Sequence, residues 1–581
     1  MSGLTRVTDY LVYCKNSVIN SVRRLLNDKL YDIVSVKDFG AIGDGVADDT
    51  TAFNNAALAL KRGQRLLVPD GDYLVSSIII DGKVSFTLQI DGNIKSSASK
   101  PGASGVPMKD TESGVSPAIK VINCKDFSIT GSGSVDGVYR ESLYIEHSNS
   151  FIVSIHLAGS NLNDNLVGVY IRYCTHFKFH NMNAESTTKK VSPYLTHLNQ
   201  IQVWDSKYFS FEGVTSINCG MNGIYIGSNC TYFNITGCHL EGNSGSGVQL
   251  AWSSFGEFPS YWNISNNTIV YNVADGIDIN NTKGAATDTV ETFGVVHGNI
   301  LAYNGWTNSD PLSGVPTADG SGVGTFIKVS RVTVTDNISY GSARSGLALI
   351  RCSNIVASGN DITKLELGTV GEGMYIEHCA NIVADSNTII VTDSIDCIKT
   401  YGDNSHVRIT NNSLHGKLTF ADGTYPMCSF KYNRCECPLQ VLAVMDMIGN
   451  SIAVTTAGNN GLYVTSPVTI ERNTITAPNF ALVIDNKSRV KVLGNNLTGG
   501  NGGAYANTAK YCKFSANTFV GTSAAGIQIT GASDNCELSE NYATSTSGNS
   551  YLIGPSVTLT HKWGNEAGSP TNFGGTYGIN F

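Results

Sequence analysis

Between Asn222 and Tyr401 one short phrase recurs in seven copies. Its copies are Gly223-Ile-Tyr-Ile226, Gly247-Val-Gln-Leu250, Gly276-Ile-Asp-Ile279, Gly324-Thr-Phe-Ile327, Gly346-Leu-Ala-Leu349, Gly373-Met-Tyr-Ile376 and Cys397-Ile-Lys-Thr400. They start 24, 29, 48, 22, 27 and 24 residues apart. A short strand that recurs at about one spacing, with occasional long insertions, is typical of a solenoid.

Side chains alternate along a strand, so the second and fourth positions of each phrase point one way and the third points the other. The second and fourth positions are nearly all apolar and are expected to stack into one continuous core. The third position forms a mixed column that we predict to face outward: Tyr225, Gln249, Asp278, Phe326, Ala348, Tyr375 and Lys399.

A second repeat follows the first, with an asparagine between apolar residues. It occurs at Asn267, Asn299, Asn360, Asn387, Asn412, Asn450, Asn473, Asn495 and Asn517, with looser copies at Asn337 and Asn541. Asparagine tolerates turn conformations, and stacked copies can form an amide ladder. Two phased repeats without helix-length segments between them predict an all-β parallel β-helix. The alternative, a β-sandwich with regular turns, predicts no such asparagine register.

Composition excludes several classes of protein. The chain has 581 residues, 61 glycines and a net charge of −8, which disfavours a general nucleic-acid surface. No apolar run approaches the ~20 residues of a membrane span, and no secretory signal is visible at the N-terminus. The 14 cysteines are scattered, and we predict buried free thiols in a protein folded in a reducing cytosol. We expect no metal and no cofactor.

Residues 1 to about 30 carry apolar residues at 3-4 spacing and predict a helix. A short coiled-coil stem and an amphipathic helix packed on the body both fit this pattern.

The next segment reads VKDFGAIGDGVADDTTAF over Val36–Phe53 and LLVPDGDYLV over Leu66–Val75. Asp48, Asp49 and Thr50 suit the start of a helix that reaches about Leu60, and such a helix can cover the open first coil of a solenoid. These two motifs resemble the beginning of the pectate-lyase-like β-helix superfamily, especially bacteriophage tailspike and capsule-depolymerase proteins. The resemblance covers the fold from about residue 35 to 545, while its specific motifs lie in residues 35–75.

The resemblance implies a right-handed, single-stranded parallel β-helix that forms a homotrimer in the virion tail. It also implies an enzyme that is made in the host cytoplasm and cleaves a bacterial capsular polysaccharide or O-antigen at the cell surface. The expected domains are a helical virion-attachment segment that binds another tail protein (1–34), the start of the β-helix with its capping region (35–120), the β-helix body (121–550) and a C-terminal cap or trimer contact (551–581).

Carboxylates, aromatic residues and long insertions coincide on the coils between about residues 240 and 320. Glycoside hydrolysis needs one carboxylic acid and one carboxylate, and two close acids shift each other's pKa values apart. We predict Glu241, Asp275 and Asp278 as catalytic residues and expect Glu241 to face outward. The predicted substrate-binding residues are Tyr225, Gln249, Trp252, Tyr271, Trp306 and Asp319.

Simpler alternatives remain open: the aspartates can be turn residues, and the aromatic residues can pack loops or a subunit interface. A second acidic cluster lies two to three coils on and ranks behind the first, because it lacks aromatic company. Its members are Glu366, Glu372, Glu377, Asp393 and Asp396, with Arg351 and Lys399.

Asp275-Gly-Ile-Asp278 is also similar to the catalytic strand of polygalacturonase-like hydrolases. No Asp-Asp pair follows one coil later, however, so pectin-type specificity does not follow. Two other functions compete with hydrolysis. One is a polysaccharide lyase, for which His297, Lys328, Tyr340, Arg344 and Arg351 are candidate groups. The other is a non-catalytic adhesin that uses the same groove for binding.

Overall fold

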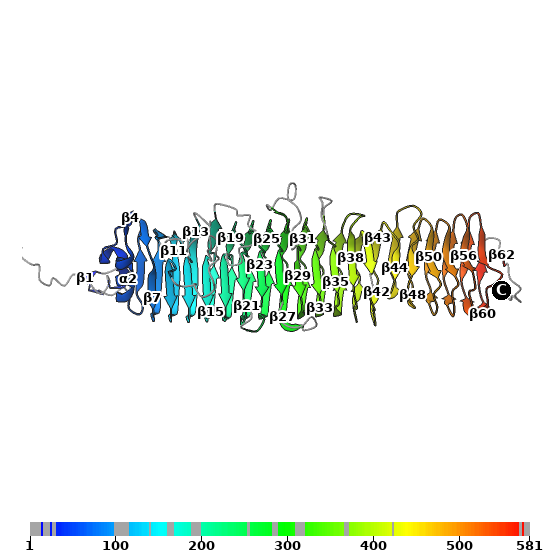
Figure 1. Ribbon diagram of the computed structural model, residues 1–581, viewed down its shortest axis with the longest axis horizontal. Helices are drawn as coiled ribbons and strands as arrows, with labels where there is room; N and C mark the ends of the chain where they lie inside the picture. The colour runs from blue at the N-terminus through cyan, green and yellow to red at the C-terminus, as the bar shows by residue number, and fades with distance from the viewer. Residues whose placement is uncertain are drawn as a thin grey trace, which may run out of the picture. The chain divides into compact units, whose positions relative to one another are not determined.

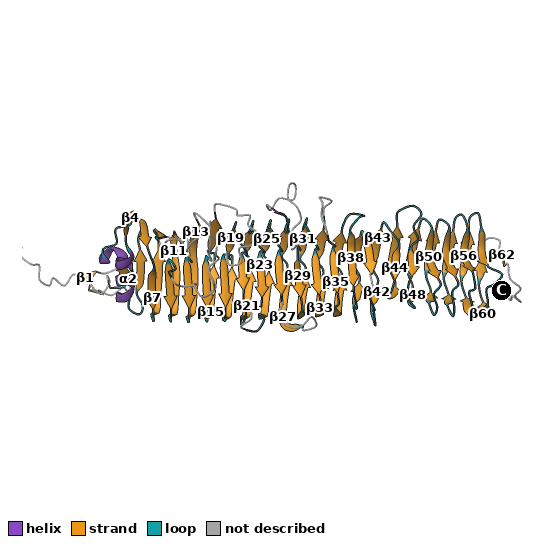
Figure 2. Cartoon of the chain, viewed as in Figure 1, coloured by secondary structure: helices purple, strands orange, loops and turns teal. Residues whose placement is uncertain are grey.

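The structure is a computed structural model. It describes residues 13–14, 24–25, 31–97, 116–138, 141–159, 168–186, 199–252, 256–281, 289–307, 320–364, 371–420, 423–568 and 572–573. The chain divides into two compact units, Met1–Gly245 (unit 1) and Ser246–Phe581 (unit 2). Figure 1 colours unit 1 from blue to green and unit 2 from green to red, and in Figure 2 strands dominate both units.

Unit 1 contains the helices that are described. After β3 (Ile33–Ser35) come the 3-10 helix η1 (Val36–Phe39), β4 (Asp44–Asp48), α2 (Thr50–Ala59), β5 (Arg65–Val68) and β6 (Asp72–Val75). The predicted helix is thus confirmed as α2, where Asp48 Oδ1 accepts the main-chain N–H of Thr50 at 2.9 Å. The side chain of Asn54 donates to Ser77 O at 3.1 Å and accepts from the N–H of Ile79 at 2.8 Å. The capping role of α2 stays a prediction.

Each later coil of unit 1 contributes one strand to each of three faces. In two coils a single long strand, β11 or β13, belongs to both the second and the third face. The first face contains β7 (Ile78–Asp81), β10 (Ile119–Ile122), β12 (Leu143–Glu146), β14 (Val169–Arg172), β17 (Ile201–Trp204) and β20 (Ile224–Ile226). The second contains β8 (Val84–Ile90), β11 (Lys125–Asp136), β13 (Asn149–Gly159), β15 (Thr175–His180), β18 (Lys207–Glu212) and β21 (Thr231–Thr236). The third contains β9 (Asn93–Ser96), β16 (Asn183–Ser186), β19 (Thr215–Ile217) and β22 (His239–Glu241), together with the ends of β11 and β13.

Unit 2 repeats this three-sided coil, with the phrase strands on its first face. That face contains β23 (Val248–Ala251), β26 (Ile277–Asn280), β29 (Gly324–Ile327), β32 (Leu347–Ile350), β35 (Met374–Glu377), β38 (Asp396–Tyr401) and β41 (Lys417–Phe420). A seven-stranded sheet serves the later coils: β44 (Val441–Ala443), β47 (Leu462–Val464), β50 (Phe480–Asp485), β53 (Gly502–Asn507), β56 (Ala525–Thr530), β59 (Asn549–Ile553) and β62 (Asn572–Phe573).

The other two faces of unit 2 run alongside the first. The second contains β24 (Ser260–Ser265), β27 (Val290–His297), β30 (Val329–Thr335), β33 (Ser353–Ser358), β36 (Ala380–Asp385), β39 (Arg408–Thr410), β42 (Ser429–Lys431), β45 (Asp446–Ile448), β48 (Thr469–Glu471), β51 (Lys491–Leu493), β54 (Lys513–Ser515), β57 (Cys536–Ser539) and β60 (Leu559–Trp563). The third contains β25 (Thr268–Val270), β28 (Ile300–Ala302), β31 (Ile338–Tyr340), β34 (Asp361–Thr363), β37 (Thr388–Ile390), β40 (Ser413–His415), β43 (Arg434–Cys437), β46 (Ser451–Val454), β49 (Thr474–Ala477), β52 (Asn496–Gly499), β55 (Thr518–Gly521), β58 (Tyr542–Ser545) and β61 (Glu566–Ala567).

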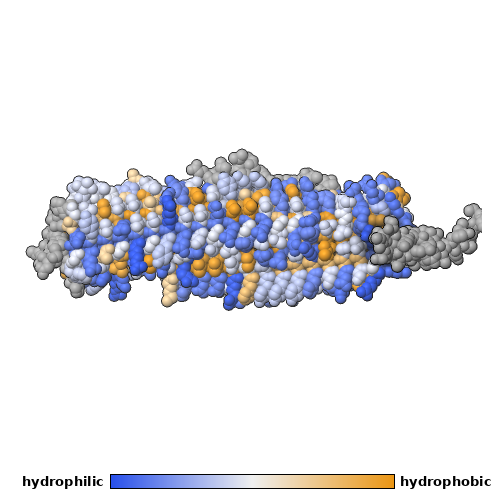
Figure 3. Space-filling model, turned by 180° about the vertical axis from the view of Figure 1, so that it is seen from behind, coloured by the Kyte–Doolittle hydropathy of each residue, from blue (hydrophilic) through white to orange (hydrophobic). Residues whose placement is uncertain are grey.

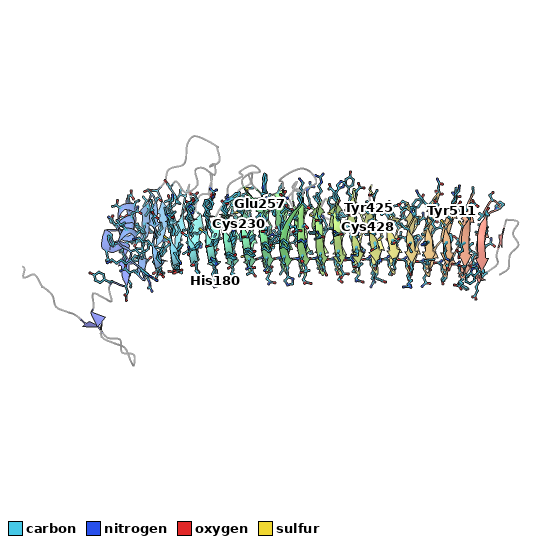
Figure 4. All side chains as sticks on the ribbon, turned by 90° about the horizontal axis from the view of Figure 1, so that it is seen from below. His180, Cys230, Glu257, Tyr425, Cys428 and Tyr511 are labelled. Atoms are coloured by element: carbon cyan, nitrogen blue, oxygen red, sulfur yellow. The ribbon has the colours of Figure 1, made fainter. Side chains whose placement is uncertain are left out.

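Strands of successive coils pair in parallel and in register, so equivalent side chains stack in columns (Figure 4). In unit 1 six inward phenylalanines of the second face form such a column, with ring centroids 4.8–5.1 Å apart: Phe86, Phe127, Phe151, Phe177, Phe209 and Phe233. Near-parallel rings at this spacing add to the stabilisation that burial itself supplies. The solenoid core is therefore a set of in-register ladders.

The predicted asparagine ladder is confirmed in unit 2. Buried asparagines of successive coils are joined from Nδ2 to Oδ1, beginning with Asn267→Asn299 and ending with Asn541→Asn565, at 2.8–3.1 Å. Asn433 and Asn565 join the predicted members. The left-handed backbone belongs to the residue before each asparagine, such as Asn266 (φ 55°) and Arg472 (φ 54°). The asparagines are therefore used for their amides, and the turn conformation lies one residue earlier.

Two predictions about the fold are wrong. Phe326 does not face outward: it is buried, and Thr325 pairs with Asp278 and Ala348 in its place. Gly324 takes φ 155°, and the strand phase differs there by one residue from the phase that the phrase suggests. The N-terminal helix is also wrong where it is described, because Tyr13–Cys14 (β1) and Arg24–Leu25 (β2) pair as antiparallel strands.

The cysteines agree with the sequence analysis. All those whose side chains are described are free and buried, including Cys230 and Cys428, which are labelled in Figure 4. Burial raises the pKa of the Cys124 thiol to about 11 and that of Cys219 to about 12. Such thiols are unreactive packing groups. Within the described part of the chain, no helix is long and apolar enough to cross a membrane.

Candidate functional site: the Glu372 cleft

The outward side chains of the first face of unit 2 form a row with one member per coil. Strand register orders them as Gln249, Asp278, Thr325, Ala348, Tyr375 and Lys399. Alternation along the strands directs these side chains away from the core. The row therefore confirms the predicted outward column, apart from the exchange of Phe326 for Thr325.

A cleft of about 400 Å³ opens over this row between β29 and β38. We call it the Glu372 cleft; its polar wall contains Ser321, Thr325, Arg344, Glu372, Tyr375 and Lys399. Ala348 lies between Thr325 and Tyr375 in the row, and its methyl group leaves the space that a larger residue would fill.

Glu372 is the carboxylate that lines the cleft. Its Oε1 accepts from Nζ of Lys399 at 2.9 Å and its Oε2 from Oγ of Ser345 at 3.1 Å. The side chain is 14% exposed, so two donors orient a largely buried carboxylate. The hydrogen bond to Glu372 raises the pKa of Lys399, which keeps a positive charge beside the carboxylate.

Tyr375 extends this network along the sheet. Its hydroxyl donates to Glu377 Oε2 at 2.8 Å, and the Lys399 ammonium lies 5.8 Å from the centre of its ring. Burial, followed by the hydrogen bond to Glu377, raises the pKa of the phenol, so Tyr375 acts here as a hydrogen-bond donor. Asp396 lies one coil beyond Glu372, where its main-chain oxygen accepts from Gly373 N and its carboxylate from Thr419 Oγ1.

The two predicted catalytic aspartates border the cleft. Asp275 is 3% exposed, and its Oδ1 accepts from Ser321 N at 2.6 Å and Thr325 Oγ1 at 3.0 Å. Asp278 is 7% exposed and accepts from Nε2 of Gln249 at 2.6 Å. Because Ser321 and Thr325 line the cleft, Asp275 holds one of its walls.

Glu241 lies elsewhere. It belongs to β22 on the third face of unit 1, outside the first face that carries the outward row of that unit. As predicted, its side chain points outward while Leu240 is buried, and its Oε2 lies 2.7 Å from Nε2 of His239 in a half-exposed pair. An isolated surface pair of this kind contributes little to stability.

The predicted sugar-binding aromatic residues differ in exposure and in their contacts. Trp306 is 1% exposed and its indole donates to Gly341 O at 2.9 Å, so the prediction of an exposed sugar platform is wrong for this residue. Trp252 is half-buried and donates to Gly256 O at 2.8 Å. Tyr271 stacks on Tyr303 with centroids 5.2 Å apart.

Two further predicted residues complete the set. Tyr225 lies on the first face of unit 1, where its ring centroid is 5.5 Å from that of Trp204. Asp319 lies outside the described residues, as does Glu366 of the second cluster. On the side of the molecule seen in Figure 3, apolar residues form scattered patches among hydrophilic ones.

The sequence analysis did not predict Ser321, Thr325 and Ser345, which line the cleft, or Lys364, which lies beside it. Lys364 is 4% exposed, and its Nζ donates to the main-chain oxygens of Arg344 and, at 3.1 Å, Gly371. Burial lowers the pKa of this lysine to about 7, against the raising effect of Glu372. A strongly perturbed group beside a cleft marks a candidate functional site.

No group of three or more His, Cys, Asp or Glu side chains within the described ranges is arranged to hold a metal ion. The chemical groups that line the cleft are the Glu372 carboxylate, two cationic side chains, a phenol and hydroxyls. This set can bind a polar chain of sugars and supply general acid–base catalysis.

Comparison with known proteins agrees with the β-helix fold. A family model described as "Right handed beta helix region" matches residues 443–560, within unit 2. The chain is also similar to the "Tail spike protein" of an Escherichia phage, with 39% identity over 75 residues, which are 13% of this chain and 9% of that protein. The match thus spans less than a tenth of the relative's length.

Solved structures show likeness at lower identity. The pre-mature bacteriophage phi29 gene product 12 is 13% identical with a TM-score of 0.48, over 91% of this chain and 73% of that one. The Dettilon tailspike protein is 14% identical with a TM-score of 0.37, over 76% and 70%. The chain contains a right-handed β-helix region and is related, over a short part of its sequence, to a phage tail spike protein.

Proposed function

We propose that this chain is a phage tail protein that binds a bacterial capsular polysaccharide or O-antigen in the Glu372 cleft and hydrolyses its glycosidic bonds. The observation that carries the proposal is a carboxylate held by two donors in a cleft on a rigid, in-register sheet. Groups on such a sheet are preorganised for catalysis. The sequence relation to a phage tail spike protein supports a place in the virion tail.

Glu372 is proposed as the base or nucleophile, because both of its oxygens accept hydrogen bonds. Asp396, one coil on, is the proposed acid. The two residues lie on adjacent coils, whose strands are about 4.8 Å apart along the sheet. A carboxyl separation of ~5–5.5 Å would predict retention of configuration, and one of ~6.5–9.5 Å inversion.

Asp275 and Asp278 are proposed as positioning residues of the cleft. Asp278 stands three coils from Tyr375 in the outward row, which is about 14 Å at ~4.8 Å per coil. That distance exceeds the ~9.5 Å limit for an inverting acid pair. A catalytic role for Glu241, on the third face of unit 1, remains an alternative proposal.

The assembly is proposed to be a homotrimer that joins another tail protein through residues 1–34, as the resemblance implies. The expected domain boundaries at residues 34, 120 and 550 are likewise proposals.

A lyase reaction is the second candidate, because Arg344 and Lys399 both line the cleft. Two cations can neutralise the carboxylate of a uronate, which eases removal of the proton beside it. A third possibility is an adhesin that binds the same chain without cutting it.

One assay separates these functions. Purified wild-type protein is incubated with a panel of capsular polysaccharides and O-antigens, and products are followed by reducing ends and by the ultraviolet absorbance of unsaturated uronates. The proposal predicts reducing ends without that absorbance. Absorbance would identify a lyase, and binding without either signal would identify an adhesin.

A further inference from the structure

Lys364 lies in a column that neighbouring coils fill with small or apolar residues. Main-chain hydrogen bonds align it with Gly341 on one side, through Gly341 N→Thr363 O, and with Val391 on the other, through Lys364 N→Ile390 O. Val391 is buried, as is Lys364. A charged group at such a position is costly unless it is bonded, so the contacts of Nζ explain why it is tolerated.

Those contacts lead to the main chain beside Ser345, one of the two donors to the cleft carboxylate, and beside Glu372, which carries that carboxylate. Nζ donates to the main-chain oxygen of Arg344, which precedes Ser345, and to that of Gly371, which precedes Glu372. Ser345 Oγ in turn donates to Glu372 Oε2 at 3.1 Å. The Lys364 ammonium therefore links the main chain next to Ser345, the hydrogen-bond donor, to the main chain next to Glu372, the acceptor.

Gly371 makes this junction tight. Its φ is +87°, and a Cβ added there would lie 3.0 Å from Ser345 N and 3.2 Å from the carbonyl carbon of Arg344. A side chain at residue 371 would therefore crowd the main chain at Arg344 and Ser345 and strain the left-handed backbone. Such contact leaves little freedom for the Ser345–Glu372 pair as long as the lysine holds both segments.

We propose that Lys364 is a positioning residue for Glu372: by tying the main chain at Arg344 to that at Gly371, it fixes the carboxylate in the cleft. The inference rests on the proposed function of the cleft and goes beyond it by assigning a buried cation as its support.

The charge on Lys364 strengthens its hydrogen bonds to the main-chain oxygens of Arg344 and Gly371. Hydrogen bonds from an ammonium are shorter and stronger than those from a neutral amine. The charged groups that act on Lys364 are Glu372, which favours its protonated form, and Arg344, which disfavours it. Lys399 belongs to the same network through Glu372. Since the pKa of Lys364 is about 7, the tie weakens as the pH rises through neutrality.

The test compares Lys364→Met, Lys364→Arg and a matched control, Lys513→Met, which removes a lysine that pairs with Glu537 away from the cleft. Hydrogen–deuterium exchange of peptides covering 343–349 and 371–376 reports directly on how firmly Lys364 holds these two main-chain segments. Cleavage kinetics against pH report on its consequence for Glu372.

We expect faster exchange of both peptides in Lys364→Met but not in Lys513→Met. We also expect a fall in kcat of roughly 10- to 100-fold with KM little changed, as for a misplaced catalytic group. Lys364→Arg keeps the donors and a permanent charge, so it should slow the exchange again, restore part of kcat and remove the decline above about pH 7.

Exchange in Lys364→Met equal to that of the control would overturn the proposal, as would an unchanged kcat and pH profile. If Lys364→Met exchanges faster but the wild-type protein cuts no polysaccharide, the positioning role of Lys364 is upheld and the function proposed for the cleft is rejected. The two failures are therefore distinguishable.

Discussion

Ala348 is the smallest side chain in the outward row of unit 2, and the Glu372 cleft depends on its size. Ala348→Phe is expected to fill the cleft and abolish polysaccharide binding and cleavage, because residue 348 lines the cleft. Thr333→Phe, on the second face, is the matched control. Equal binding by both variants and the wild type would place the glycan elsewhere.

Lys364 also predicts how stability depends on pH. Its pKa falls from 10.5 to about 7 on folding, so between these values the unfolded chain holds a proton that the folded chain lacks. Stability should therefore rise with pH across this window, by up to about 1.4 kcal/mol per pH unit. Below about pH 7 both states are protonated, and the cost of the buried charge is fully present.

Denaturation midpoints at about pH 6 and about pH 9 check this expectation. The wild type should gain more stability between the two conditions than Lys364→Met, which has no proton to lose. Identical gains in the two proteins would show that the lysine keeps its ordinary pKa.

At this scale the sequence predicts the direction of side chains better than their roles. Alternation places Asp278, Tyr375 and Lys399 outward, because the phrase is short and regular. It fails at Phe326, where a glycine with φ 155° precedes a shifted strand. Lys364 was detectable as a lysine aligned with Gly341 and Val391, but its partners are main-chain oxygens, which no sequence pattern marks.

The asparagine ladder is the element-scale feature with the sharpest consequence for stability. The side chain of Asn495 accepts from the main-chain N and Nδ2 of Asn473 and donates to Ile470 O and Asn517 Oδ1. Asn495→Ala leaves these buried groups without partners and is expected to cost about 2–4 kcal/mol. Asn496→Ala, one residue on and exposed, should change stability by less than about 0.5 kcal/mol.

Urea midpoints of the two variants and the wild type provide the measurement. A loss shared equally by the neighbouring substitutions would mean that strand propensity, rather than the ladder, sets the cost.

Elements were predictable where they repeat and not where they deviate. The phrase strands, the asparagine register and α2 follow from period and capping residues. The exposure of the aromatic residues does not follow from the sequence. A tryptophan in a long insertion looks the same in the sequence whether it binds a sugar or, like Trp306, is buried. The cleft was missed as the first site because its floor is an alanine, which no motif singles out.

For the whole molecule, we propose that residues 1–34 attach the protein to the virion. Deleting them should abolish incorporation into particles, while the isolated protein keeps its cleavage activity, because the cleft lies in unit 2. Immunodetection of the protein in purified virions checks the first expectation and a polysaccharide assay the second. Normal incorporation of the truncated chain would assign attachment to another part of the molecule.

If the polysaccharide is cut in the Glu372 cleft, Glu372→Gln should release almost no oligosaccharide. The control is Glu537→Gln, which removes a carboxylate that also accepts from a lysine at 2.9 Å in unit 2. Asp278→Asn is measured beside them. We expect a loss of cleavage activity of at least about 10²-fold for Glu372→Gln with binding retained, a smaller loss for Asp278→Asn and none for the control. Full activity in Glu372→Gln, or a larger loss in Asp278→Asn, would contradict this expectation.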